Sequence, residues 1–344
     1  MSPRSAATPA PKAAKPKLAI FGAASCGGCD IALVNIHEHI LEVAAAFEIV
    51  LWPTVMDGKY SDVEALPDGG IALTLVSGSM RTAETVSLSR MLRRKSAIMV
   101  ALGSCAHEGC IPGLANLSSR EQIMDTAFST VSTDNPDGVR PAWEYEAPEG
   151  VLRLPEFEPM LRTLGQVVDV DYTIPGCPPE SGQIWAALAA LMAALDGTGP
   201  LPPKGAVLGA GSSTVCDECP RERNVKKIGR FLRIQQVAAI DPDLCLLEQG
   251  LPCNGPATRS GCGALCPKAS ALCIGCYGGA EGVSDYGARL MSAFASVVDA
   301  TGPDGIDEAL DGIPDPAGQF YRFSLAGSLL RGGRPAWRDG GERP

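Results

Sequence analysis

The chain has 344 residues, thirteen cysteines and a formal net charge of −10. It is long enough for two domains, and its negative charge argues against nucleic acid as the main partner, because phosphate binding needs a broad basic face. No apolar stretch is long enough to span a bilayer, and residues 1–16 have the composition of a disordered tail rather than of an export signal. We therefore expect a cytoplasmic chain with reduced thiols, in which this many cysteines indicate metal binding.

Residues 17–199 alternate short apolar runs with helical patterns. The runs are continuous rather than alternating, as strands buried on both faces should be. We expect strands at Leu18–Phe21, Glu48–Trp52, Ile71–Ser77, Ala97–Leu102 and Val167–Tyr172, and helices near residues 30–46, 82–95 and 180–195. This order predicts an α/β fold with a flavodoxin-like, doubly wound parallel sheet. The long interruption from about Ile111 to Gly165 should lie outside the sheet as a lid or a partner-binding excursion.

Residues 200–344 follow a proline-rich linker and differ in composition. Cys, Gly, Pro and charged residues dominate, and the only long helix expected is Ser284–Asp299. Such a segment buries too little apolar surface to fold unaided, so we expect metal centres to hold it together. Eight of the thirteen cysteines lie in it.

Four cysteines of the N-terminal part follow three expected strands. Cys26 and Cys29 come after the first strand, Cys105 after the fourth and Cys177 after the fifth. Because ligands of an open parallel sheet bind at the carboxyl ends of its strands, these four thiols should meet at one place. Four thiolates fit an iron–sulfur cluster or a structural zinc, and ligands spread over three strand ends favour the cluster over a compact zinc knuckle.

The downstream cysteines divide naturally into two groups of four. One group is Cys216, Cys219, Cys245 and Cys253, and the other is Cys262, Cys266, Cys273 and Cys276. A proline directly after Cys219 and after Cys266 is also seen in bacterial ferredoxin motifs. The spacing is not that of a compact ferredoxin run, so two zinc sites remain an alternative to two clusters.

These motifs together resemble the small subunit of a [NiFe]-hydrogenase. The resemblance rests on Ala-Ser-Cys26-Gly-Gly-Cys29, Gly-Ser-Cys105-Ala-His-Glu-Gly, Pro-Gly-Cys177-Pro-Pro, Cys216-x-x-Cys219-Pro-Arg, Cys245-Leu-Leu-Glu-Gln-Gly and Cys273-Ile-Gly-Cys276, which occur in family order. Within the family, the segments 111–116 and 132–136 look closest to the cytosolic F420-non-reducing (methyl-viologen-reducing) type.

The resemblance implies an oxidoreductase subunit that carries electrons from hydrogen through three [4Fe-4S] clusters to a cytosolic acceptor. The proximal cluster would be held by Cys26, Cys29, Cys105 and Cys177, the medial one by Cys262, Cys266, Cys273 and Cys276, and the distal one by Cys216, Cys219, Cys245 and Cys253. The nickel–iron centre would lie on a separate large subunit, and a further iron–sulfur or flavin subunit, linked to heterodisulfide reductase, would accept the electrons. Two alternatives are a ferredoxin-like carrier without a hydrogenase partner and a zinc-stabilised interaction module.

Several residues fall outside this scheme. His37 and His39 have the character of ordinary surface or interface residues, whereas His107 either donates a hydrogen bond toward a cluster sulfur or belongs to a plain loop. The cations Arg221, Arg223, Lys226, Lys227, Arg230 and Arg233 lie beside the expected distal cluster and form either a solvated face, or a docking surface or charge compensation for an anionic cluster. Cys110 is the thirteenth cysteine: it is either a small buried thiol or a sulfur within reach of the proximal cluster that can ligate iron on oxidation.

Overall fold

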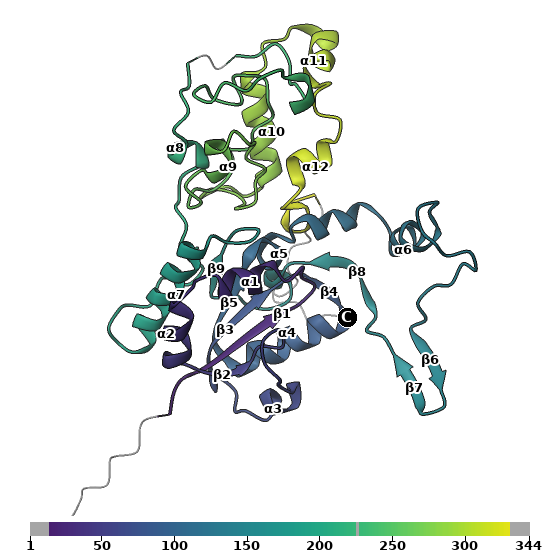
Figure 1. Cartoon of the computed structure of the whole chain (residues 1–344), viewed down its shortest axis with the longest axis vertical. Coiled ribbons are helices and arrows are strands. Elements are labelled where there is room, and N and C mark those ends of the chain that lie inside the picture. The colour runs from purple at the N-terminus through teal and green to yellow at the C-terminus, as the bar shows by residue number, and fades with distance from the viewer. Residues whose placement is uncertain (1–13, 225–226, 331–344) are drawn as a thin grey trace, which may run out of the picture.

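The structure, a computed structural model, describes residues 14–224 and 227–330. The tail predicted for residues 1–16 therefore lies almost wholly outside the described residues, as does Lys226. A sheet region (residues 17–199) and a loop-rich C-terminal region (residues 200–330) lie one above the other in Figure 1, joined by the chain that follows α7. No helix in the described part of the chain is both long enough and apolar enough to cross a membrane.

Five parallel strands form the central sheet. They are β1 (Lys17–Gly22), β2 (Glu48–Leu51), β3 (Ile71–Ser77), β5 (Ser96–Leu102) and β9 (Tyr172–Ile174). Their order across the sheet is β2-β1-β3-β5-β9, and Ile20 pairs with Leu75 where β1 meets β3. In chain order this is the flavodoxin-like sequence 2-1-3-4-5, so the predicted fold class is confirmed.

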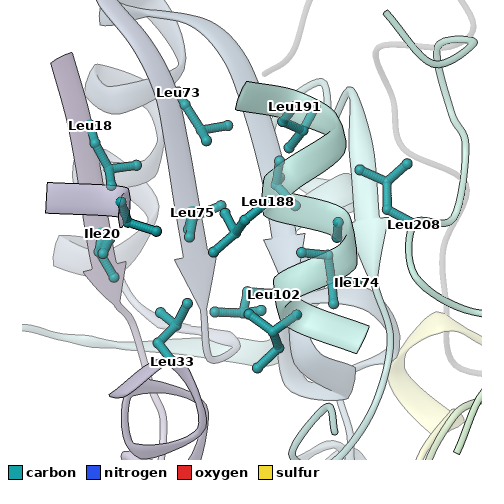
Figure 2. Close-up of a cluster of buried hydrophobic side chains, with 14 of the residues drawn as sticks. Leu18, Ile20, Leu33, Leu73, Leu75, Leu102, Ile174, Leu188, Leu191 and Leu208 are labelled. Atoms are coloured by element: carbon teal, nitrogen blue, oxygen red, sulfur yellow. The ribbon is translucent and has the colours of Figure 1, made fainter. Parts of the chain in front are cut away.

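Helices cover both faces of this sheet. The helices α1 (Gly28–Val34), α2 (His39–Ala46) and α7 (Ser181–Leu195) pack on one face, while α3 (Tyr60–Glu64) and α4 (Ala83–Lys95) pack on the other. Figure 2 shows Leu188 and Leu191 of α7 facing Leu73 and Leu75 of β3. Both faces of the inner strands β3 and β5 are therefore buried, which explains why these strands are continuous apolar runs.

Two expectations about the sheet region are wrong in detail. The helix expected near residues 30–46 is interrupted between α1 and α2, where His37 adopts a left-handed backbone with φ of 58°. The last strand begins at Tyr172 rather than at Val167, because Val167 and Val168 follow a 3-10 turn, η2 (Leu164–Gln166), and bury their side chains in the core without joining the sheet. Burial of an apolar run does not require it to be a strand.

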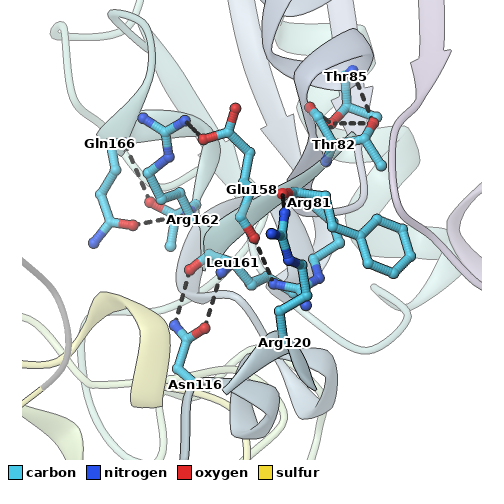
Figure 3. Close-up of polar contacts among 11 residues, drawn as sticks. Arg81, Thr82, Thr85, Asn116, Arg120, Glu158, Leu161, Arg162 and Gln166 are labelled. Atoms are coloured by element: carbon cyan, nitrogen blue, oxygen red, sulfur yellow. Dashed lines mark hydrogen bonds and ion pairs between the residues drawn. The ribbon is translucent and has the colours of Figure 1, made fainter. Parts of the chain in front are cut away.

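The excursion lies outside the five-stranded sheet, as expected. It comprises η1 (Ile111–Leu117), α6 (Arg120–Ser129), the hairpin β6 (Glu144–Ala147) and β7 (Gly150–Arg153), and β8 (Phe157–Arg162), which pairs antiparallel with β4 (Met80–Thr82). At its base the Asn116 side chain bonds both backbone groups of Leu161, at 2.9 Å each, and Arg81 donates to the Glu158 carbonyl (Figure 3). Residues 118–156, here called the arm, project away from the sheet (Figure 1).

The C-terminal region has more helix than expected. The long helix is confirmed as α10 (Tyr286–Val297), but α11 (Gly302–Leu310) and α12 (Pro316–Tyr321) were not expected, being short and begun by prolines. Phe294 of α10 stacks on Phe231 and meets Phe320 of α12 edge-on, at centroid distances of 4.8 and 5.5 Å. The rest consists of loops and single turns, α8 (Val215–Glu218), η3 (Ile234–Gln236), α9 (Leu265–Lys268) and η4 (Leu325–Gly327).

Candidate metal centres

The four thiols of the proximal set, Cys26, Cys29, Cys105 and Cys177, come together at the carboxyl ends of β1, β5 and β9. Cys29 lies in the first turn of α1, and Cys105 lies in α5 (Gly103–Glu108), which follows β5 directly. Burial, together with the charges of Cys105, Cys177 and Cys26, raises the pKa of the Cys29 thiol to about 12. Such mutual repulsion favours neutral thiols unless a cation binds, which is the electrostatic character of a thiolate metal site.

Glycine is required beside this set. Gly103 has φ of +81°, and a Cβ added to it would lie 2.5 Å from the Cys29 sulfur. A Cβ on Gly28 would lie 3.4 Å from the Cys26 sulfur. At Gly103 the backbone thus approaches a sulfur more closely than any side chain would allow, whereas a Cβ at Gly28 would be in ordinary contact. The close approach at Gly103 fits a site that must surround a bulky cluster.

The distal set, Cys216, Cys219, Cys245 and Cys253, lines a single cavity. Val215, Leu246 and Leu247 supply much of the apolar wall. Burial raises the pKa of the Cys216 thiol to about 12, with Cys253 and Cys245 adding to the rise. Gly255 again leaves space, since a Cβ there would lie 3.1 Å from the Cys216 sulfur and 3.7 Å from that of Cys253. An apolar cavity with four convergent thiols and a glycine wall fits an iron–sulfur cluster.

The medial set, Cys262, Cys266, Cys273 and Cys276, lies in the loops around α9. Burial, together with the charges of Cys262, Cys266 and Cys177, raises the pKa of Cys276 to about 12. Backbone N–H groups donate to the sulfurs here: those of Ala264 and Leu265 reach Cys262, and that of Gly275 reaches Cys273. Hydrogen bonds to ligand sulfurs are one of the means by which a protein sets a cluster's reduction potential.

One peptide group joins each pair of neighbouring sets. The N–H of Cys177 in the proximal set donates to the sulfur of Cys276, and the N–H of Cys273 in the medial set donates to the sulfur of Cys253. The medial set thus touches both of the others, and the three sets form a series. Among the described residues, no three Cys, His, Asp or Glu side chains converge closely enough to hold a single metal ion.

Cys110 lies against the proximal set. It is buried, and its sulfur is 3.5 Å from that of Cys177. Hydrogen bonding to Cys110 lowers the pKa of Cys177 to about 7 and also lowers that of Cys105, while the pKa of Cys110 itself is raised. The backbone of Cys110, with φ of 52° and ψ of −159°, is in a region that glycine normally occupies.

The remaining residues singled out from the sequence have varied surroundings. His39 stacks on Trp185 at 4.0 Å and contacts Glu42. No hydrogen bond within the described residues joins His107 to a cysteine; its ring instead lines a cavity of about 680 Å³ with Glu108 and Arg259.

The expected cationic face is not uniform. Arg221 is buried, with 5% of its surface exposed, whereas Arg223, Lys227, Arg230 and Arg233 are exposed. The solvated face therefore describes the four exposed cations, whereas Arg221 is buried and lines the cavity of the distal set. Its expected part in charge compensation stays a prediction.

Comparison with known proteins bears directly on this arrangement. A family model described as "NADH ubiquinone oxidoreductase, 20 Kd subunit" matches residues 26–191. The iron-sulfur subunit of the F420-non-reducing hydrogenase of Archaeoglobus profundus is 39% identical, covering 91% of this chain and 97% of the relative. An F420-non-reducing hydrogenase subunit of Methanothermobacter marburgensis is 33% identical over 92% of this chain and 97% of its own.

The chain belongs to the family of F420-non-reducing hydrogenase iron–sulfur subunits. The family resemblance expected from the cysteine motifs is thereby confirmed, including the type within it. Among solved structures, the [NiFeSe] hydrogenase from Desulfovibrio vulgaris Hildenborough matches with a TM-score of 0.50 at 17% identity, covering 76% of this chain and 93% of that one, which speaks for the fold alone. As a member of this hydrogenase family, the chain is a subunit of an oxidoreductase that acts on hydrogen.

Proposed function

We propose that this hydrogenase subunit conducts electrons from hydrogen, split at a nickel–iron centre on a separate large subunit, through three [4Fe-4S] clusters to an acceptor in the cytoplasm. The observation that carries the proposal is the series of three thiol sets, joined by the peptide contacts Cys177 to Cys276 and Cys273 to Cys253. The acceptor would be a further iron–sulfur or flavin subunit, with heterodisulfide reductase as the candidate enzyme beyond it.

The chain's own residues position and tune the cofactors rather than perform bond chemistry. Bound iron–sulfur clusters supply one-electron carriers. The twelve thiols of the three sets would hold them, with Gly103 and Gly255 giving the backbone room to approach. The two bridging N–H groups link neighbouring sets through the backbone.

The large subunit is proposed to cover the edge of the sheet where the proximal set lies. Two apolar side chains of α1, which begins at this edge, are exposed, Ile31 at 62% and Val34 at 48%. Exposed apolar patches of this kind mark protein interfaces. The chain expressed alone should therefore aggregate, whereas a free ferredoxin-like carrier would be monodisperse with its clusters in place.

Metal analysis tests the cofactor proposal. The anaerobically purified complex should contain about twelve iron atoms per copy of this chain, with matching sulfide, in addition to the iron of its other subunits. The subunit composition should be measured on the same sample by mass spectrometry. Equimolar zinc in this chain would support the zinc-stabilised module instead, and about eight iron atoms would leave one thiol set without a cluster.

A further inference from the structure

The short segment from Cys216 to Arg221 carries two buried or half-buried charges of opposite sign. The Glu218 carboxylate reaches out of the distal motif, and its two oxygens accept hydrogen bonds from the N–H groups of Gly261 and Gly263, at 2.9 and 3.0 Å. These glycines flank Cys262 of the medial set. The negative charge of this segment therefore acts on the medial set.

The positive charge is that of Arg221, which contacts the loops of both sets and lines the cavity that holds the four distal thiols. Its guanidinium donates four hydrogen bonds, all to uncharged acceptors. These are the carbonyls of Pro267 (2.9 Å), Asp241 (2.6 Å) and Leu244 (2.8 Å) and the hydroxyl of Ser270 (2.9 Å).

This buried cation has no carboxylate partner in the described part of the chain. No Asp or Glu oxygen among residues 14–224 and 227–330 lies within ion-pair distance of Arg221. Burial of an unpaired charge costs several kcal/mol, so an anion should balance it. The thiolates of the distal set, bound to iron, are the anionic group within the same cavity.

We propose that Glu218 and Arg221 set the direction of electron flow between the medial and distal clusters. A fixed negative charge lowers the reduction potential of a nearby cluster, and a fixed positive charge raises it, because reduction adds an electron. Glu218 makes the medial cluster a better donor, and Arg221 makes the distal cluster a better acceptor. The inference deepens the proposed function and depends on the clusters assigned there.

Both side chains are also structural, since each ties the distal loop to the medial loop. Arg221 bonds the Pro267 carbonyl directly after Cys266, and Glu218 bonds the backbone on both sides of Cys262. A test must therefore separate charge from hydrogen bonding. Arg221→Lys keeps the charge and loses the fork of donors, while Arg221→Met loses both.

The experiment is an anaerobic redox titration of the intact complex, followed by electron paramagnetic resonance, with the distal signal assigned from a Cys216→Ser variant. Arg221→Met should lower the distal potential and shift the medial-to-distal equilibrium about tenfold against outward transfer, or about 59 mV for one electron. Glu218→Gln should raise the medial potential and shift the same equilibrium in the same direction. Arg221→Lys should keep the parental distal potential.

Exposed charges that follow this segment in the chain provide matched controls. Lys227→Met and Glu222→Gln remove charges that solvent already screens. In these variants the medial-to-distal equilibrium constant should stay within about twofold of the parental value. Arg223 also lines the distal cavity but is exposed; Arg223→Met should therefore give a shift smaller than that of Arg221→Met.

The outcomes are distinguishable. An unchanged distal potential in an iron-replete Arg221→Met complex would overturn the inference, as would an equal shift in Arg221→Lys, which would assign the effect to hydrogen bonds. If Arg221→Met loses iron, the medial potential of Glu218→Gln decides: a rise supports the inference and no change overturns it. A parental complex without iron in this chain would refute the proposed function itself.

Discussion

The sheet region and the C-terminal region differ in how they position their cysteine side chains. In residues 17–199, a sheet covered on both faces exists independently of the cysteines and aims three strand ends at one point. In residues 210–280, single turns and loops surround the thiols, and a small apolar cluster contains Cys253 and Cys273 themselves. The first region positions its metal site; in the second, we expect the metal sites to position the chain.

The largest effect should follow from removing iron. With the metal chelated anaerobically, loops 210–280 should exchange their amide hydrogens faster by orders of magnitude, because bound metal supplies folding free energy that few apolar contacts replace. Peptides from β3 and β5 should keep their protection. Hydrogen exchange with mass spectrometry on loaded and chelated protein measures both at once. Equal loss of protection in the two regions would contradict the idea that only the C-terminal region depends on metal for its fold.

A smaller effect is expected from one methyl group in the sheet region. Gly103→Ala places a Cβ 2.5 Å from the Cys29 sulfur at a left-handed backbone position, so the proximal set should no longer accept a cluster. The iron content of this chain should fall by about one third, or about four atoms, while the fold of the sheet persists by circular dichroism.

Gly138→Ala is the matched control for that substitution. Gly138 also has a left-handed φ, of +62°, but nothing lies within 4 Å of its added Cβ. The Gly138→Ala variant should keep its full iron content. Its left-handed backbone should lower the free energy of unfolding by a similar amount to that in Gly103→Ala, about 1 kcal/mol. Parallel iron loss in both variants would mean that backbone strain, rather than the collision with Cys29, is responsible.

The junction between the two regions should show a pH effect. Glu108 of α5 packs on the C-terminal loop at Gly278 and Gly279, and burial raises its pKa from 4.5 to about 7. Its Oε2 is buried without a hydrogen-bond partner. Because the folded protein binds this proton more tightly than the unfolded chain, stability should fall as pH rises from about 4.5 to 7, and the loss is complete above 7.

Glu108→Gln should remove the fall in stability between about pH 4.5 and 7. At pH 8 the variant should be more stable than the parent by up to about 3 kcal/mol, and near pH 4.5 the two should be alike. Thermal unfolding across this pH range measures the difference, with the exposed Glu149→Gln as control. A variant less stable than the parent at pH 8 would show that the carboxylate is favourable at the junction.

The smallest effect on the resting protein is expected at Cys110. Cys110→Gly relieves an unfavourable backbone conformation, so anaerobic hydrogen oxidation and stability should change little. The half-life of the variant's activity in air should shorten, because we expect the Cys110 sulfur, 3.5 Å from that of Cys177, to ligate an iron of an oxidised proximal cluster. Cys110→Ala, which keeps the backbone strain and lacks the sulfur, should lose the same protection. Equal half-lives in air would make Cys110 a simple packing residue.

The sequence predicts the sheet region well and the C-terminal region in outline. Continuous apolar runs locate four of the five strands, because burial on both faces leaves a strong pattern. The fifth is displaced since Val167 and Val168 are buried outside the sheet. The grouping of twelve cysteines into three sets follows from chemistry and family resemblance, and the assignment of each set to one cluster stays a prediction.

What the sequence does not reveal are contacts between distant loops. Arg221 is one of six cations in its segment, and only the fold distinguishes it, through carbonyls of residues 241, 244 and 267 that no local pattern relates to it. The helices α11 and α12 were not predicted from the sequence for a similar reason. They are too short for a clear period and are stabilised by packing against Phe231 and α10.

The arm has a consequence of its own for work with this protein. Its hairpin, β6 and β7, pairs only with itself, and Tyr145 and Leu152 are 63% and 60% exposed within the described structure. An isolated two-stranded hairpin is marginally stable in water, so its order should depend on whatever it rests against. Amide exchange in residues 144–153 would then be a built-in reporter of assembly, fast in the lone subunit and slow once a neighbour covers the hairpin.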